Sequence, residues 1–167
     1  MRRRIRILAA SAMLMLALCA TARAASVPGP SAMSTGFVDY PAFQQGSSSA
    51  RALWFHRART LGARWVRLTV YWSSIAPFTL PPGFRASDPG AHGYDWTSLD
   101  EAVKDATAEG LHVVLVVQQA PNWAEGPGVP SYASPGSWEP SVSAFAAFAH
   151  AIALRYSGRF ADPLHGL

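Results

Sequence analysis

Three stretches of the chain place apolar residues three and four positions apart, which is the spacing of one helix face. They span residues 49–61, 97–109 and 141–156, and a glycine follows each, at positions 62, 110 and 158. Their apolar stripes are Leu53, Trp54, Ala58 and Leu61; Leu99, Ala102, Val103 and Ala106; and Phe145, Phe148, Ala149, Ile152 and Tyr156. The pattern predicts three amphipathic helices that end at glycine. Thr97, with Asp100 three residues later, is expected to cap the second.

Two runs between these helices are apolar over nearly their whole length and rich in β-branched and aromatic residues. Residues 64–71 and 112–118 therefore predict strands covered on both faces, as the strands of a parallel sheet are. A weaker strand is expected at 33–38. Alternation gives the first run one aliphatic face, which suits packing against helices, and one mixed face. The aliphatic face is Val66, Leu68 and Val70; the mixed face is Trp65, Arg67 and Thr69.

The order of these elements, helix then glycine then strand, predicts a parallel α/β sheet that is either open or closed into a barrel. The loops before the strands are short, whereas those after them, at 72–96 and 119–140, are long. Long loops at the carboxyl ends of strands are typical of a (β/α)8 (TIM) barrel. An open nucleotide-binding sheet would carry a G-x-G-x-x-G turn, which this sequence lacks. We therefore expect an α/β fold comprising about the first three βα units of a parallel barrel.

The first 24 residues are typical of an export signal. Four arginines within residues 2–6 precede the apolar run 7–20, and Ala22-Arg23-Ala24 supplies a small-x-small cleavage pattern. The apolar run is shorter than the ~20 residues of a membrane span. We expect a signal peptide at 1–24, a linker at 25–32 and a folded domain at 33–167 that is secreted to the periplasm or outside the cell. A retained membrane anchor is the alternative.

Removal of this signal changes the charge of the chain. Of 14 basic residues, five lie at or before Arg23, so nine remain against ten acidic residues, and the net charge falls from +4 to near −1. The remaining basic residues form no cluster, so no nucleic-acid partner is expected. Cys19 is the only cysteine, which excludes a disulfide or thiolate metal site from the mature part.

A set of short motifs follows in a consistent order along the chain. It consists of LGARWVRL at 61–68, YWSSIAP at 71–77, YDW at 94–96, GLHVVL at 110–115 and APNWA at 120–124. This succession resembles clan A glycoside hydrolases of the cellulase-like and β-xylosidase-like (β/α)8 families, over about residues 33 to 160. The resemblance implies retaining hydrolysis of O-glycosyl bonds in a polysaccharide or glycoside.

In that clan two carboxylates carry the chemistry: an acid/base in an Asn-Glu-Pro segment ending the fourth strand, and a nucleophile ending the seventh. Asn122 is the only asparagine of this chain and precedes Trp123, and Leu167 comes where the fourth strand is expected. Both catalytic carboxylates are therefore expected beyond the end of this chain, which alone would be inactive. The alternatives are a secreted, non-catalytic carbohydrate-binding protein and an inactive truncated product.

Six residues near strand ends form the candidate substrate-binding set. The resemblance implies that Arg67 faces the barrel interior and braces the nucleophile; an arginine that reaches solvent is the alternative. Aromatic rings can stack on the apolar faces of sugars, and amides can bond their hydroxyls. We therefore expect contacts with a carbohydrate from the aromatic and amide residues that follow the two strands; for these residues, packing within the loops is the alternative. They are Tyr71, Trp72, Gln118, Asn122 and Trp123, with Gln119 an alternative to Gln118.

No cofactor or metal is expected, because the five histidines are dispersed without a zinc-binding spacing. No G-x-S-x-G motif marks a serine hydrolase. The loop carboxylates Asp39, Asp95, Glu125 and Glu139 are interpreted as structural, and Asp95 is expected to cap or precede the helix at 97–109.

Overall fold

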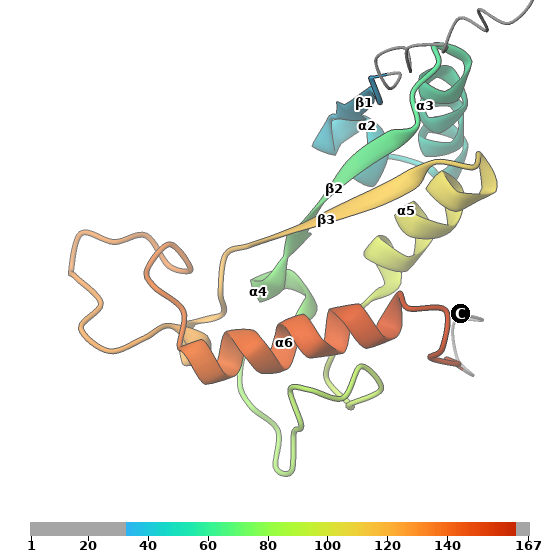
Figure 1. The fold of residues 1–167 in the computed structure, drawn as a ribbon. Coiled ribbons are helices and arrows are strands. Elements are labelled where there is room, and N and C mark those ends of the chain that lie inside the picture. The colour runs from blue at the N-terminus through green and yellow to red at the C-terminus, as the bar shows by residue number, and fades with distance from the viewer. Residues whose placement is uncertain (1–32, 163–167) are drawn as a thin grey trace, which may run out of the picture. The chain divides into compact units, whose positions relative to one another are not determined.

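The computed structural model describes residues 33–162, so the expected signal peptide and linker lie outside the described residues. Residues 34–162 belong to one compact unit. Its described part contains a parallel sheet in the order β1 (Gly36–Val38), β2 (Trp65–Tyr71) and β3 (His112–Gln118), shown in Figure 1. The predicted α/β class and all three predicted strands are confirmed, with β1 shorter than expected.

The three predicted helices are present within one or two residues of their expected bounds: α3 (Ser48–Thr60), α5 (Thr97–Ala108) and α6 (Val142–Arg155). Gly62, Gly110 and Gly158 follow them with φ of 86°, 69° and 74°. Glycine adopts this left-handed conformation at little energetic cost. The conformation ends a helix because the N–H groups that follow it then hydrogen-bond to the last carbonyls of the helix. Three short elements were not predicted: α2 (Tyr40–Gln44), α4 (Trp72–Ile75) and the 3-10 helix η1 (Asn122–Ala124).

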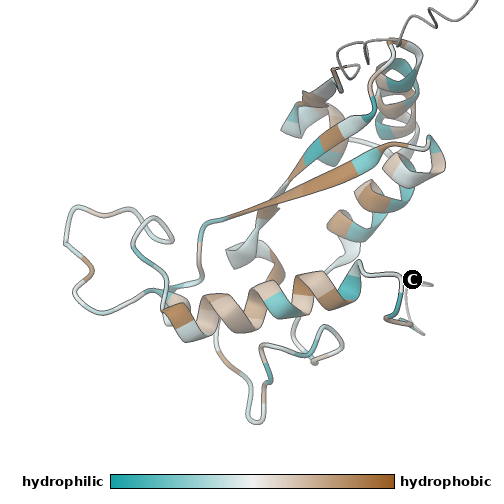
Figure 2. Cartoon of the chain, in the orientation of Figure 1, coloured by the Kyte–Doolittle hydropathy of each residue, from teal (hydrophilic) through white to brown (hydrophobic). Residues whose placement is uncertain are grey.

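The sheet divides its side chains between two faces as the alternation predicts, but within residues 33–162 one face is largely exposed, where coverage of both faces was predicted. Val66, Leu68 and Val70 are fully buried in the core that α3 and α5 cover. Figure 1 shows these two helices on one side of the strands, and Figure 2 shows β3 as largely hydrophobic and β2 as an alternation of hydrophobic and more polar residues. On the opposite face Trp65 is 40% exposed and Arg67 is exposed, whereas Thr69 is buried. Within residues 33–162, no helix is both long and apolar enough to cross a membrane.

The predicted inner face of α3 is wrong at three of its four positions, and only Ala58 is buried as predicted. Leu53, Trp54 and Leu61 are exposed, and the buried positions are Arg51, Phe55 and Ala58. Arg51 takes the inner position because α5 supplies it with two carboxylates: its Nη2 lies 2.7 Å from Glu101 and its Nε 3.1 Å from Asp105. For α5 the predicted stripe is confirmed, since Leu99, Ala102 and Ala106 are buried.

Helix α6 does not lie along β3, as the third helix of a simple βα repeat would. Its buried Phe148 instead lies between two tryptophans, stacked on Trp72 at 4.7 Å and on Trp96 at 5.8 Å between ring centroids. These tryptophans follow β2 and precede α5, so α6 crosses the carboxyl-end side of the sheet (Figure 1). The helix therefore holds the long loops of that side together.

A buried ionic cluster fixes α6 against the start of α5. The Arg155 guanidinium donates to Asp100 through Nε at 2.9 Å and through Nη2, and to Asp162 at 2.6 Å, while Tyr156 Oη donates to Asp100 at 2.8 Å. Burial works to lower the pKa of Arg155, but the bonds to Asp100 and Asp162 outweigh it and raise that pKa. Asp100 is thus not part of a capping box with Thr97; the N-cap residue is Trp96 and makes no side-chain cap bond.

We expect Arg155→Met to lower the free energy of unfolding by about 3–5 kcal/mol, because it leaves two carboxylates without their buried cation. Arg85 offers a matched control, since its ion pair with Asp88 is on the surface and its side chain is 77% exposed. Arg85→Met should cost less than ~1 kcal/mol. Urea unfolding followed by tryptophan fluorescence measures both, and equal losses would contradict the structural role of the cluster.

Candidate functional site

The carboxyl ends of β2 and β3 bring two of the predicted site residues side by side. Tyr71 and Gln118 are partners in the parallel register. Arg67 lies on the same face as Tyr71, because alternate residues of a strand share a face and the two are four residues apart. No helix of residues 33–162 covers the exposed part of this face, so we call it the open face, and define it by its own exposed and half-exposed residues. They are Trp65, Arg67 and Tyr71 of β2 and His112, Val114, Val116 and Gln118 of β3.

Arg67 makes no ion pair with any residue of the described range, and its side chain is exposed. Next to it, the rings of Trp65 and His112 are 4.8 Å apart between centroids. The open face therefore combines a cation, an amide and aromatic rings, and its end at Tyr71 is partly covered by Tyr40 of α2. Such a surface can bond hydroxyl or carboxylate oxygens and stack on apolar ring faces.

A small cavity of about 120 Å³ lies beside Tyr71. Tyr40 of α2 packs its ring edge-on against Tyr71 at 5.0 Å, and Ser74, Asp95 and Ser98 also line the cavity. Tyr40 was missed because α2 was missed. The sequence does contain a signal for that helix, since the Asp39 side chain accepts from Ala42 N at 2.9 Å and proline stands in the first turn, the pattern of a capped helix start.

Gln44, the last residue of α2, completes the edge of β2 where β1 stops. β1 pairs as far as Val38 with Arg67, which leaves the backbone of Thr69 without a strand partner on that side. Gln44 Nε2 donates to Thr69 O at 2.7 Å and Gln44 Oε1 accepts from Thr69 N at 2.6 Å. The amide thus takes the place of a strand partner at Thr69.

Trp72 is not available as a sugar platform. Its side chain is 1% exposed, because it points to the helix side with Val66, Leu68 and Val70 and stacks on Phe148. Its Nε1 is buried without a hydrogen-bond partner in the described structure. Trp72 therefore packs within the fold, which was the alternative to contact with a sugar.

Trp123 belongs to the same aromatic cluster, at the edge of it. Its ring meets Trp72 edge-on at 5.8 Å and Phe84 at 6.2 Å, and its Nε1 donates to Pro77 O at 2.9 Å. The ring is half-buried, so part of it remains open. Trp123 ties the loop after β3 to the loop after β2.

The two glutamines after β3 play different parts. Gln118 is exposed on the open face, whereas Gln119 has a positive φ of 52° and its carbonyl accepts from Ser73 N at 2.8 Å. This turn redirects the chain toward η1, where Asn122 is exposed. Geometry therefore favours Gln118 over Gln119 as the partner of Tyr71.

Three of the loop carboxylates bind backbone N–H groups, as the structural interpretation predicts. Glu125 Oε1 accepts from Gly136 N at 3.0 Å and from Trp138 N at 3.2 Å, which organises the loop 125–140. Asp95 accepts from Thr97 N at 3.0 Å at the start of α5. Asp39 caps α2, and Glu139 is exposed.

Tyr94, another titratable group of this end, has a structural role. Burial, and the charge of Asp88, raise the pKa of Tyr94, so its hydroxyl stays protonated and donates to Ala86 O at 2.6 Å. Among the described residues, no three His, Cys, Asp or Glu side chains gather in a way that could hold a metal ion.

No protein-family model matches the chain, and no curated protein matches it. The site is therefore defined by its residues and their arrangement alone.

We expect Gln44→Ala to destabilise the chain by about 1–3 kcal/mol, because it leaves the N–H and C=O of buried Thr69 unpaired. The neighbouring Gln45 is exposed, so Gln45→Ala should stay within about 0.5 kcal/mol of the wild type. Chemical unfolding monitored by far-UV dichroism distinguishes them. Indistinguishable midpoints would show that the clamp does not support β2.

Proposed function

We propose that the chain is the front part of a glycoside hydrolase of the clan A type, and that its open face forms part of a carbohydrate-binding wall. The observation that carries this proposal is the grouping of Arg67, Tyr71 and Gln118 on one uncovered face, at the carboxyl ends of parallel strands. In α/β barrels the site is built at those ends. The motif order along residues 61–124 supports the same family.

Arg67 is exposed in residues 33–162, as the solvent-reaching alternative predicts, so the barrel interpretation requires a partner carboxylate for it. A guanidinium that faced the interior of a closed barrel would have to pair with a carboxylate, since an unpaired buried charge is very costly. No residue of the described range provides that carboxylate. A nucleophilic glutamate from a later strand would fit this position, which is the bracing role that the resemblance implies for Arg67.

A second candidate, a secreted carbohydrate-binding protein without catalysis, is favoured by a different observation. Asp39, Asp95 and Glu125 bind backbone amides, and Asp100 is held by Arg155 and Tyr156. Carboxylates held in this way are poor candidates for an acid/base and nucleophile pair. Under both candidates the chain is exported and meets a glycan outside the cytoplasm, and needs no cofactor.

We expect the chain to bind soluble polysaccharides such as xylan or a mixed-linkage β-glucan, and Tyr71→Ala to weaken binding at least tenfold, which corresponds to about 1.4 kcal/mol. Tyr132, a tyrosine of the 125–140 loop that is 86% exposed, provides the matched control Tyr132→Ala. Affinity gel electrophoresis measures the retardation. Equal retardation of the two variants, or none for the wild type, would contradict the proposed wall.

We further expect no measurable hydrolysis of these polysaccharides or of aryl glycosides by the 167-residue chain, because the engaged carboxylates do not form a catalytic pair. A reducing-sugar assay tests this. Activity that disappears in Glu125→Gln or Glu139→Gln but persists in Glu101→Gln, whose carboxylate pairs with Arg51, would overturn the expectation and place catalysis in the loop 125–140.

A further inference from the structure

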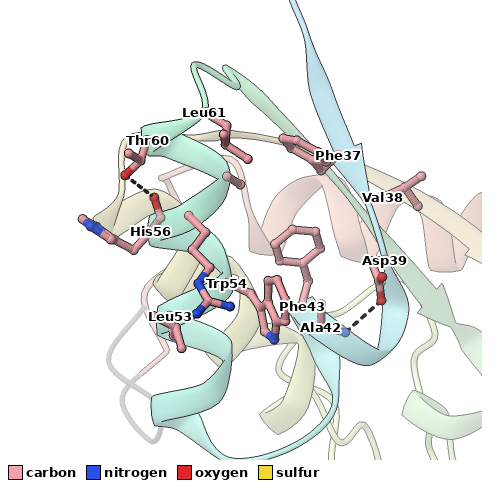
Figure 3. Close-up of a pocket in the computed structure, with 12 residues that line it drawn as sticks. Phe37, Val38, Asp39, Ala42, Phe43, Leu53, Trp54, His56, Thr60 and Leu61 are labelled. Carbon is pink, nitrogen blue, oxygen red and sulfur yellow. Dashed lines mark hydrogen bonds between the residues drawn. The ribbon is translucent and has the colours of Figure 1, made fainter.

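An apolar groove of about 590 Å³ is lined by residues of β1, α2 and α3. Figure 3 shows Phe37 and Val38 of β1 on one side of it. On the other side lie Leu53 and Trp54 of α3 and Leu61, the residue that follows this helix. Trp54 is 44% exposed and Leu61 75% exposed. These are the residues that the sequence pattern assigned to the core.

The groove adjoins an unpaired strand edge. Within the described residues β1 pairs with β2 alone, so the outer N–H and C=O groups of Gly36–Val38 have no strand partner. An open edge beside an apolar surface is a site for association, because an added strand satisfies the backbone while its neighbours cover the apolar side chains.

The charges of the groove differ from those of the opposite flank of α3. On that flank α5 supplies carboxylates, with Arg51 bound to Glu101 and Asp105. On the groove side Arg57 lies 4.7 Å above the Trp54 ring and makes no ion pair with any residue of 33–162. Asp39 lines the same groove.

The cation and the carboxylate lie toward opposite ends of β1. Asp39 follows the carboxyl end of the strand. Helix α3 ends near the amino end of β1, since Arg64 N donates to Thr35 O at 2.9 Å just after the helix, and Arg57 belongs to its last turn. A two-fold axis through the β1 edge would therefore bring each Arg57 toward Asp39 of the other copy.

We propose that this groove and edge form an isologous interface between two copies of the 167-residue chain. β1 pairs antiparallel with β1 of the second copy about Phe37, and the two sheets become one. Both α3 helices stay on the same side of that sheet and cover each other's Trp54 and Leu61. One surface supplies a self-pairing edge, apolar side chains and opposite charges at opposite ends, as a two-fold interface requires. The inference is independent of glycan binding, which concerns the open face.

Sedimentation velocity of the full chain over a range of concentrations tests the proposal. A species of twice 17.9 kDa is expected, with Leu61→Lys raising the dissociation constant at least tenfold. Phe78→Lys, at a residue that is 87% exposed and outside the groove, should leave it unchanged. A monomer at every concentration would overturn the proposal and indicate that another segment or ligand covers the groove. Larger oligomers that are insensitive to Leu61→Lys would also overturn it.

A covalent readout tests the two-fold geometry itself. Directly opposed residues of antiparallel strands have Cα atoms about 4.5–5.5 Å apart, within the range that a disulfide bridges. In a Cys19→Ser background, Phe37→Cys should form a disulfide-linked dimer on mild oxidation, whereas Phe78→Cys should stay monomeric. A Phe37→Cys chain that dimerises without cross-linking would contradict antiparallel pairing about this residue. Polysaccharide binding is measured in the same variants. A variant that loses the dimer but still binds polysaccharide shows that the interface and the proposed function are separate.

Discussion

The parallel pairing of β2 with β3 is the constraint from which the rest of the described structure follows. Seven register pairs, from Trp65–His112 to Tyr71–Gln118, keep the two strands in step. Parallel strands need a crossover to join them, and α5 provides it by covering the aliphatic face. Every long loop then leaves from the same end of the sheet. The open face and its polar residues are what remains on the opposite side.

That loop-rich end is held by long-range contacts. Phe148 lies between Trp72 and Trp96, and Arg155 joins Asp100 to Asp162 in a cluster with little access to water. Burial, with the charge of Asp100, raises the pKa of Tyr156, so its hydroxyl remains a donor within this cluster. α6 thus acts as a brace across the loops, and the proposed carbohydrate wall is built on a supported edge.

Local periodicity was enough to predict the strands and the three long helices, because alternation and three-to-four spacing depend only on residues that are close together in the sequence. The inner face of α3 could not be read in the same way, since Arg51 is inward only because α5 brings Glu101 and Asp105 to it. The pair Asp100–Arg155 joins residues 55 positions apart, so a local capping rule misassigned Asp100. Trp72 was predictable in hindsight: one further step of the alternation places it with Val66, Leu68 and Val70.

The central claim, that the open face meets a glycan, is tested most directly by amide hydrogen exchange with and without cello- or xylo-oligosaccharides. The account predicts slower exchange at the carboxyl ends of β2 and β3 and in residues 119–124, with no change in α3 or in the groove beside β1. Unchanged exchange at those strand ends, or protection confined to the groove or to the 125–140 loop, would contradict it.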